Sequence, residues 1–439
     1  MQFPELPVKQ GDSHLFVTFS GGCASFLLVS ADYQQVLTSV DTFVAPLSRA
    51  FGADQADLFL AKSLTAWSAD IGVDLVGCED DLCMMSLSEE GRVGGATLLV
   101  SPEYVAEPFH SVVLGVESQV YDEKTHIDAA VKYFDAYGFS RLIYVVLDWD
   151  TIRVLILTTG RVHSHREGKT IVREMHISGE FLDKIPETMV PSLLSTRMRK
   201  DVLIDALSNV RDRKVTAVGS DDVRDVLRGY VTGALFGMKD PEFQVFGSKS
   251  DHGLIVTGDI ARVLPEKNTI LSVIDGLQLR GRYSIFVDRE QRGVPAVVAS
   301  ESGAFIFPLP DIYPRRYEYI STQKGGSGKN GQTAFRGRIR QQGCVDDRDD
   351  IIIVGQTGHV YSFSVQGAGN VLLQPSKSVY FPAMEKVMMG EDVYVTTEYS
   401  SQSASVIVDC RTIPVVYGPD ALANHQRISE WLRGFPGEQ

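Results

Sequence analysis

Three turns along the chain have residue types that could hold a phosphate group. They are Ser20–Gly21–Gly22–Cys23, Asp148–Trp149–Asp150–Thr151 and Thr257–Gly258–Asp259. A glycine lets backbone N–H groups approach phosphate oxygens because no Cβ blocks them. Aspartate carboxylates are suitable ligands for Mg²⁺, which accompanies nucleotide phosphates. A phosphate and metal site is therefore one hypothesis, and ordinary ligand-free turns are the other, because Asp, Thr and Gly favour turns in any case.

Two other groups of residues look like ligand sites but are better explained as structural. The run 325–329 is rich in Gly and ends in Lys, as in a P-loop, but Asn330 follows that lysine and no strand leads directly into the run. Cys78 and Cys83 have a spacing that zinc sites use, but no second Cys or His pair lies near them in the sequence. We therefore expect a loop and two structural cysteines there.

A pair of histidines and a basic cluster leave alternatives open. His163 and His165 lie in a Gly-containing, charged turn, so we expect a solvated loop there. No Gly-x-Ser-x-Gly motif occurs, although a catalytic triad can also be dispersed along a chain.

A cluster of basic residues in 315–340 is either a solvated loop or a docking surface for an acidic partner or a phosphate-bearing ligand. Its members are Arg315, Arg316, Lys324, Lys329, Arg336, Arg338 and Arg340.

The elements that would position the three turns are predicted from hydrophobic periodicity. β-rich runs on either side of turn residues predict one hairpin from 14–19 and 24–29, and a second from 142–147 and 152–157. A third strand is expected at 170–177. The two hairpins lie about 130 residues apart, which indicates an internal duplication and not a short solenoid repeat.

Helices and further strands alternate along the rest of the chain, which predicts an α/β fold. Helices are expected at 57–69, 127–137, 189–210, 223–236, 268–277 and 421–432. Buried strands are expected at 253–258 and 283–287, and short strands at 351–354, 359–365, 393–397, 405–409 and 413–417. The run 321–332 is expected to be a loop or linker. The predicted domains are 1–138, 139–312 and a β-rich 313–439.

Length and composition restrict the class of protein. The 439 residues carry 56 acidic and 42 basic side chains, for a net charge of −14, which argues against a nucleic-acid binder. The chain has only five cysteines, and this small and odd number argues against a disulfide scaffold. No apolar stretch is long enough for a membrane span and no signal peptide is recognised. We predict a cytoplasmic protein with a protein partner, and leave a peripheral membrane complex or an oligomer open.

Two hairpins with small residues at their tips, followed by a strand that ends in a Gly-containing turn, resemble the layout of actin-like ATPases. This superfamily, also called ASKHA, includes sugar kinases, Hsp70 and actin. The resemblance implies a duplicated actin-like (ribonuclease H-like) core with a small β-rich C-terminal domain. In that core the two hairpins clasp the phosphates of a nucleotide, and the later glycine turn abuts the adenosine.

Within this superfamily, residues 255–288 resemble the MutL proteins associated with cobalamin-dependent glutamate mutase. The resemblance is carried by Thr257–Gly258–Asp259, by Asp275–Gly276–Leu277–Gln278–Leu279–Arg280–Gly281 and by Val287–Asp288–Arg289. Near the C-terminus, Val408–Asp409–Cys410–Arg411 with Pro414, Arg427 and Trp431 resembles the ending of that family. The second half of the chain carries this resemblance, and the first half matches only in its hairpin pattern.

The resemblance implies a nucleotide site with ATP and Mg²⁺ as its ligands. The sequence alone does not establish either ligand. Phosphate would be received by Ser20, Gly21, Gly22 and Ser25, Mg²⁺ would be held by Asp148 with Thr151 beside it, and Gly258 would lie against the adenosine. The motifs are degenerate, however. The first hairpin lacks the family's carboxylate, and Asp150 and Asp259 replace glycines. Each carboxylate placed against a polyphosphate would cost about 1–4 kcal/mol unless a metal ion lies between them.

These departures favour a pseudo-ATPase. The leading hypothesis is a non-catalytic scaffold or assembly protein, comparable to the PilM-like proteins of similar architecture. No catalytic residue is assigned, and a weak ATPase activity stays open. The alternative is an ATP-dependent chaperone or reactivating factor for a cobalamin-dependent mutase, similar to the MutL family. A sugar or acid kinase ranks third, because no general-base aspartate can be assigned.

Overall fold

The fold was analysed in a computed structural model of the whole chain. The structure describes residues 13–20, 23–30, 36–43, 95–100, 117–120, 123–149, 151–159, 170–178, 189–211, 220–238, 243, 252–289, 316–321, 323–324, 331–341, 351–365, 369–376, 379–380, 393–397, 404–411, 415, 417 and 420–434. The chain divides into two compact units. Unit 1 comprises Met1–Tyr137 and Asp288–Tyr313, and unit 2 comprises Gly138–Val287 and Pro314–Gln439.

Unit 1 contains a five-stranded sheet with the strand order β3-β2-β1-β4-β5. The first three strands form an antiparallel meander, whereas β4 pairs parallel to β1 and β5 pairs parallel to β4. The strands are β1 (Ser13–Ser20), β2 (Cys23–Ser30), β3 (Val36–Phe43), β4 (Gly95–Val100) and β5 (Glu117–Val120), followed by helix α3 (Glu123–Tyr137). The predicted first hairpin is confirmed as β1 and β2.

Unit 2 repeats the same topology in its larger sheet. Its first five strands have the order β8-β7-β6-β9-β10, with β6-β7 and β7-β8 antiparallel and β6-β9 and β9-β10 parallel. They are β6 (Arg141–Leu147), β7 (Thr151–Thr159), β8 (Thr170–Ser178), β9 (His252–Thr257) and β10 (Arg282–Val287). Two sheets of equal order and strand direction within one chain confirm the duplicated actin-like, ribonuclease H-like core.

The C-terminal part of unit 2 is β-rich, as expected, and contributes to two sheets. Three strands extend the larger sheet in the order β15-β19-β11 next to β10: β11 (Arg316–Ser321), β15 (Val360–Val365) and β19 (Ala404–Asp409). Four others form a separate sheet in the order β14-β13-β16-β18: β13 (Thr333–Gln341), β14 (Ile351–Gln356), β16 (Gly369–Pro375) and β18 (Val393–Thr397). Strands β12 (Gln323–Lys324) and β17 (Val379–Tyr380) form a small ribbon.

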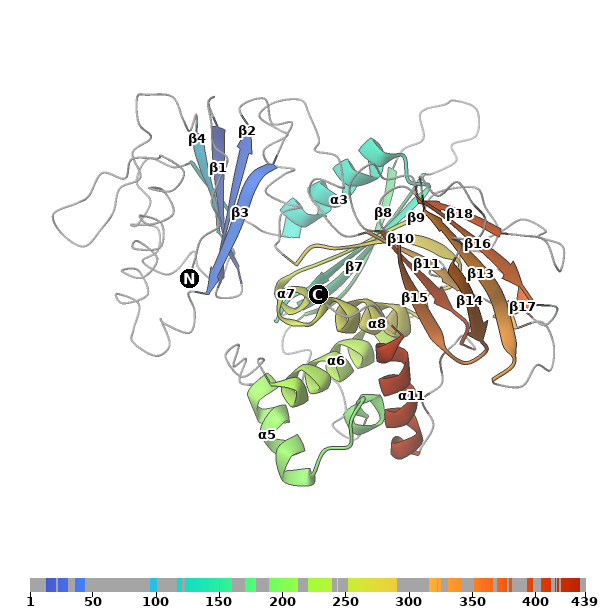
Figure 1. The fold of residues 1–439 in the computed structure, drawn as a ribbon. Helices are drawn as coiled ribbons and strands as arrows, with labels where there is room; N and C mark the ends of the chain where they lie inside the picture. The colour runs from blue at the N-terminus through green and yellow to red at the C-terminus, as the bar shows by residue number, and fades with distance from the viewer. Residues whose placement is uncertain are drawn as a thin grey trace. The chain divides into compact units, whose positions relative to one another are not determined.

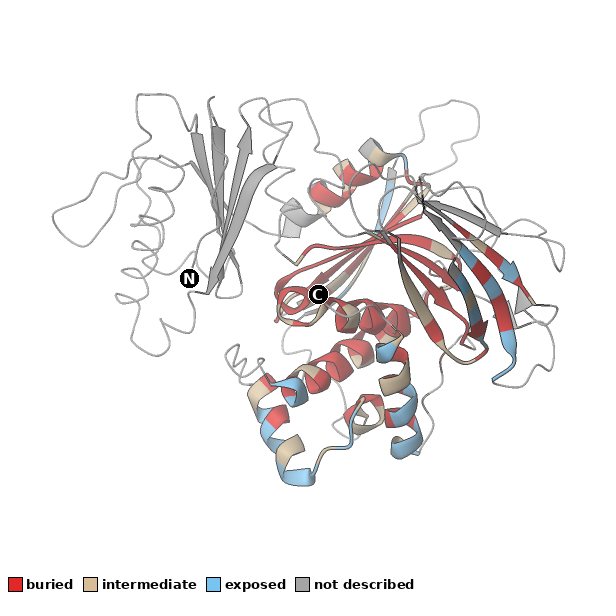
Figure 2. Ribbon diagram, in the orientation of Figure 1, coloured by how far each residue is buried: buried red, intermediate tan, exposed pale blue. Residues whose placement is uncertain are grey.

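The helices of unit 2 gather on one face of its larger sheet (Figure 1). They are η3 (Val190–Leu193), α5 (Lys200–Arg211), α6 (Asp221–Phe236), α7 (Asp259–Val263), α8 (Glu266–Leu277) and α11 (Ala421–Arg433). Helices α6 and α8 approach closely because Gly276 has no side chain: a Cβ there would lie 2.4 Å from the Cβ of Leu235. The central strands, α6 and α8 share one apolar core and are buried over most of their length (Figure 2).

The long helix expected at 189–210 is wrong, because the chain forms η3, then an irregular segment, then α5. Leu194 is extended with ψ 152°, which ends the helical conformation after η3. The backbone N–H groups of Ser195 and Thr196 donate to the Asp225 carboxylate on α6, at 2.8–3.1 Å. These hydrogen bonds replace helical ones for Ser195 and Thr196, so the break leaves neither of these two N–H groups unsatisfied.

Several other expectations can be compared with the described residues. The helices expected at 223–236, 268–277 and 421–432 are confirmed as α6, α8 and α11. The nine-residue strand β13 was not expected and occupies part of the basic 315–340 segment. Several predicted features lie outside the described residues: the helix expected at 57–69, Cys78, Cys83, His163, His165 and the whole Gly-rich run 325–329. Among the described helices, none has the length and apolar character to cross a bilayer.

Candidate functional site

The hairpin turn between β6 and β7 holds two of the predicted site residues. The backbone N–H of Asp148 donates to the carbonyl oxygen of Thr151 at 3.0 Å, which closes the turn. The Thr151 hydroxyl donates to the carbonyl oxygen of Ile177 at 3.1 Å, so the start of β7 is also fixed to the end of β8. Trp149 is buried within the turn. Asp150, the carboxylate expected to repel phosphate, lies outside the described residues.

Gly258, the third predicted site residue of this unit, packs directly against that turn. Its φ is +103°, in the region that L side chains rarely adopt. A Cβ at this position would lie 2.7 Å from Asp148 Oδ1 and equally close to the backbone N and O of Leu147. Glycine is therefore required here for two reasons, the backbone conformation and the close approach of the end of β6.

The same close approach brings the Asp148 carboxylate to the start of α7. The backbone N–H of Asp259 donates to Asp148 Oδ1 at 3.1 Å, across 111 residues of sequence. A carboxylate that accepts a helix's first N–H group satisfies a donor that has no intrahelical partner. The structure thus brings Asp148, Thr151 and Gly258 together, because Asp148 follows β6, Thr151 begins β7 and Gly258 follows β9, and these strands are neighbours in the sheet. It adds Asp259, which is buried, as a second carboxylate-bearing residue of the turn.

The predicted residues of the first hairpin lie in unit 1. Ser20 ends β1 opposite Cys23, and Ser25 of β2 lies opposite Thr18 in the antiparallel register. Gly21 and Gly22, between the two strands, lie outside the described residues. The two hairpins belong to different compact units. The roles of Ser20, Gly21, Gly22 and Ser25 toward a phosphate remain predictions.

The carboxylates of Asp148 and Asp259 do not form a recognisable metal centre in the described part of the chain. No cluster of three or more His, Cys, Asp or Glu side chains with metal-binding geometry occurs among the described residues. Asp148 as the ligand of Mg²⁺ remains a prediction. In the structure, its carboxylate has an identified role in the protein itself, as the acceptor for Asp259.

A buried charge cluster, not recognised from the sequence, lies where the C-terminal segment meets α8. Arg411 is almost fully buried, and its Nη2 lies 2.7 Å from Asp275 Oδ1 and 2.7 Å from Asp409 Oδ2. Its Nε donates to Asp409 Oδ1 at 2.9 Å, which completes a two-point contact with that carboxylate. The guanidinium also lies 4.4 Å from the centre of the Trp431 ring on α11.

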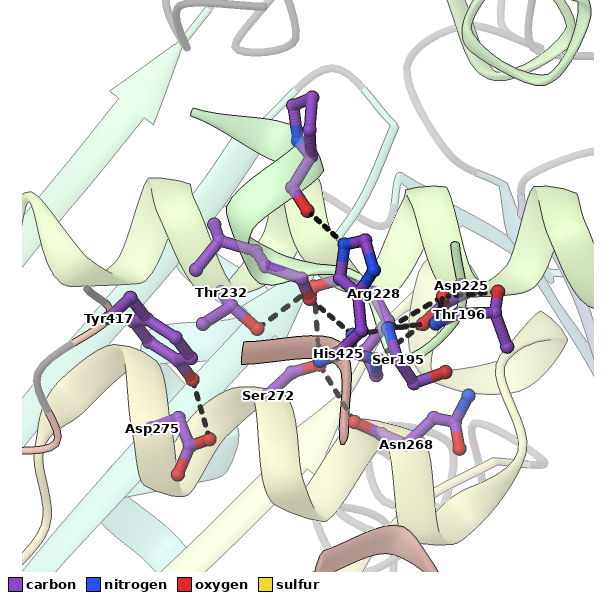
Figure 3. Close-up of polar contacts among 12 residues, drawn as sticks. Ser195, Thr196, Asp225, Arg228, Thr232, Asn268, Ser272, Asp275, Tyr417 and His425 are labelled. Carbon is purple, nitrogen blue, oxygen red and sulfur yellow. Dashed lines mark hydrogen bonds and ion pairs between the residues drawn. The ribbon is translucent and has the colours of Figure 1, made fainter. Parts of the chain in front are cut away.

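Two tyrosines complete the cluster (Figure 3 shows Tyr417 and Asp275). Tyr319 donates its hydroxyl to Asp409 Oδ2 at 3.2 Å, and the partly exposed Tyr417 donates to Asp275 Oδ2 at 2.8 Å. Burial, together with these carboxylates, raises the pKa of both tyrosines well above the ordinary value. Burial lowers the pKa of Arg411, but Asp275 and Asp409 outweigh it and hold that pKa well above the usual value.

These contacts give a structural role to two of the motifs that carried the MutL resemblance. The Asp275–Gly281 motif and the Val408–Arg411 motif meet through Arg411, and Gln278 also accepts the backbone N–H of Val415. Gln278 adopts a left-handed conformation, with φ 55°, at the C-terminus of α8. The motif residues therefore hold the C-terminal segment against α8. Their spacing of more than 130 residues gave no sequence signal that they would meet.

A second buried ion pair lies within α6, and its two residues also contact the segment before α5 (Figure 3). Arg228 is fully buried, and its Nη2 lies 2.9 Å from Asp225 Oδ1 while also donating to the carbonyl oxygen of Leu193. Asp225 in turn accepts from Ser195 and Thr196. On the neighbouring helix α11, His425 Nε2 donates to the carbonyl oxygen of Pro191 at 2.8 Å. These polar contacts join α6, η3 and α11, and we assign them a structural role.

Comparison with known proteins gives no family for the chain. No protein-family model matches it, and no curated protein matches it in sequence. The finer resemblance to the MutL family therefore stays a prediction.

Solved structures with some similarity include actin-like proteins of different function. A Ppx/GppA phosphatase from Aquifex aeolicus has 8% identity, over 56% of this chain and 67% of that chain, with a TM-score of 0.27. The ethanolamine utilization protein EutJ from Carboxydothermus hydrogenoformans has 12% identity over 66% and 90%, with a TM-score of 0.34. A ROK family transcriptional regulator, a homolog of the E. coli MLC protein, has 12% identity over 67% and 78%, with a TM-score of 0.29. These similarities are too low to carry an argument, so the strand order of the two sheets is what identifies this chain's fold as actin-like.

Proposed function

We propose that this protein is a non-catalytic scaffold or assembly protein built on a degenerate actin-like nucleotide-binding fold. The observation that carries the proposal is the contact between the Asp148 carboxylate and the Asp259 backbone N–H, directly against Gly258. In this arrangement the carboxylate that a nucleotide-binding relative would use for Mg²⁺ serves to join two turns of the protein.

The charge of the turn supports the same proposal. Asp259 replaces a glycine of the related motif and is buried, so its carboxylate has little water around it. A polyphosphate brought to this turn would meet the negative charges of Asp148 and Asp259 in a low-dielectric environment. Each like-charge contact at a few ångströms costs about 1–4 kcal/mol, which opposes nucleotide binding unless a cation intervenes.

The alternative, an ATP-dependent chaperone or reactivating factor for a cobalamin-dependent mutase, is favoured by one observation. Asp148 and Gly258 directly follow the neighbouring strands β6 and β9, and Thr151 begins β7, so the three residues lie at one end of these strands, which is the arrangement that nucleotide binding would need. The two proposals differ in whether this edge binds Mg²⁺-ATP. A protein partner and a cytoplasmic location are part of both proposals.

The test is the thermal unfolding of the full chain with Mg²⁺-ATP, Mg²⁺-ADP and Mg²⁺ alone. Binding at a hundredfold excess over Kd would stabilise the folded state by about 2.7 kcal/mol, a measurable shift. For a scaffold we expect no nucleotide-dependent shift at millimolar nucleotide, and formation of a stable complex or filament without it.

Asp148→Asn provides the matched variant. Asparagine keeps a side-chain oxygen that can accept the Asp259 N–H but removes the negative charge, so folding should be nearly unchanged. A shift with Mg²⁺-ATP in the wild type that disappears in Asp148→Asn, together with Mg²⁺-dependent turnover, would replace the scaffold proposal with the chaperone alternative.

A further inference from the structure

The four-stranded sheet of unit 2 has one face packed and one face exposed. Phe335 of β13 and Val371 and Leu373 of β16 pack with residues of β11 and β19, such as Ile320 and Val406, in one apolar cluster. This face of the four-stranded sheet therefore lies against the larger sheet. Because side chains alternate along a strand, the neighbouring positions of β13, β14 and β16 form the opposite, outer face.

The outer face combines exposed apolar residues with exposed arginines. Ile352 and Val354 of β14 are 70% and 51% exposed, which is unusual for side chains of this type. Arg336 and Arg338 of β13 are also exposed. In the antiparallel register Arg336 lies opposite Val354 and Arg338 opposite Ile352, so the four side chains share one face. Exposed positions on this sheet are visible in Figure 2.

The two arginines carry charge that other described residues do not neutralise. Neither guanidinium has an ion-pair partner among the residues that the structure describes, whereas Arg316 on the neighbouring sheet pairs with Glu318. The cross-strand neighbours on the third strand are uncharged: Gln374 opposite Arg336 and Leu372 opposite Arg338. A basic and apolar face on a chain of net charge −14 is a local departure from the charge of the whole protein.

We propose that this outer face, defined by Arg336, Arg338, Ile352 and Val354, binds an acidic, partly apolar segment of a partner protein. Carboxylates of the segment would pair with the two arginines, and its apolar side chains would cover Ile352 and Val354. Strand β14 is also the edge strand of its sheet in the described part of the chain, so an extended segment can add to the sheet through its backbone. This possibility of strand addition favours a polypeptide over a lipid surface as the occupant.

The proposed binding face lies on the four-stranded sheet and does not include the Asp148 turn. The presence or absence of nucleotide binding therefore does not test this proposal. The probe is a library of random 12-residue displayed peptides, selected on the immobilised full chain and counter-selected on the Arg336→Glu, Arg338→Glu variant. We expect the enriched peptides to be acidic and to contain Val, Ile or Leu. One such peptide, synthesised with a fluorescent label, should bind the charge-reversed variant at least about tenfold more weakly.

The matched control reverses the two exposed arginines Arg197 and Arg199, which have the same spacing but lie before α5 in the same unit. This control should keep its affinity, whereas Ile352→Thr with Val354→Thr should lower affinity without any change in charge. Should the charge-reversed variant unfold, Arg336→Gln with Arg338→Gln serves in its place. If the Arg197, Arg199 control loses as much affinity for the peptide, the effect is a general attraction between opposite charges, and the proposal is overturned.

Three other outcomes would also overturn it. One is the absence of any enriched acidic peptide. Another is arginine-dependent binding to phosphatidylserine vesicles without peptide binding, which would assign the face to a membrane. The third is a concentration-dependent dimer that the charge reversal abolishes, which would assign the face to a second copy of the chain.

Discussion

Gly258 shows how a single residue fixes the geometry of the candidate site. Its positive φ and the missing Cβ allow the start of α7 to approach the end of β6, and this approach brings Asp259 to the Asp148 carboxylate. The glycine of this turn is required by packing within the protein itself. A requirement for glycine is therefore not sufficient to identify a nucleotide site.

Gly258→Ala should destabilise the protein by about 2–4 kcal/mol, because it adds steric overlap with the Leu147 backbone to an unfavourable φ. Urea unfolding measures this change. Gly331→Ala is the matched control, since Gly331 also has a positive φ of 83° but a Cβ there would have no atom within 4 Å. It should cost only about 1 kcal/mol. Equal losses in the two variants would show that close packing against β6 contributes nothing.

At the scale of elements, a carboxylate on one helix decides where another helix begins. Apolar periodicity in 189–210 predicted one continuous helix, but the Asp225 side chain of α6 binds the N–H groups of Ser195 and Thr196 and separates η3 from α5. Asp225 also pairs with Arg228, which is fully buried. The acceptor lies about 30 residues after the break, beyond any local sequence pattern.

Asp225→Ala should cost about 3–5 kcal/mol, because it leaves the buried Arg228 without its carboxylate and two backbone donors without an acceptor. Chemical denaturation reads out the loss. Asp222→Ala, at an exposed position in the first turn of the same helix, should cost less than about 1 kcal/mol. If both variants lose the same small amount, the ion pair and the hydrogen bonds to Ser195 and Thr196 have no energetic role.

At the scale of the whole molecule, the C-terminal segment belongs to the core of unit 2. Strands β11, β15 and β19 extend its larger sheet, and Arg411 joins the segment to α8 through Asp275. Tyr319 and Tyr417, which donate to Asp409 and Asp275, are part of the same connection. The protonation of these tyrosines should therefore influence the stability of the whole unit.

Stability should fall as the pH rises above about 10. The folded-state pKa values of Tyr319 and Tyr417 are raised, mainly by burial, so the unfolded chain loses these protons first. Below pH 10 both states hold the protons. Above it, each tyrosine removes about 1.4 kcal/mol per pH unit until its folded pKa is reached. Denaturation across pH 9–12 measures this slope. Tyr417→Phe should make it shallower, and an unchanged slope would contradict the role of Tyr417.

The local elements and part of the site could be predicted from the sequence. β-rich runs on either side of turn residues predicted both hairpins, and helical periodicity predicted α6, α8 and α11. The sequence also selected Asp148, Thr151 and Gly258, which the structure brings together. The strand β13 was not expected, because the basic residues Arg336 and Arg338 are as typical of a solvated loop or a docking surface as of a strand.

Which distant segments meet became clear only from the three-dimensional packing. The contacts of Asp148 with Asp259 and of Arg411 with Asp275 join segments more than 100 residues apart. The break before α5 likewise depends on a carboxylate from α6. Periodicity specifies which face of an element is buried, but not which other element covers it. That choice depends on the packing of the whole core, and it is the reason why Asp275, Asp409 and Arg411, which carried the family resemblance, form a buried structural cluster.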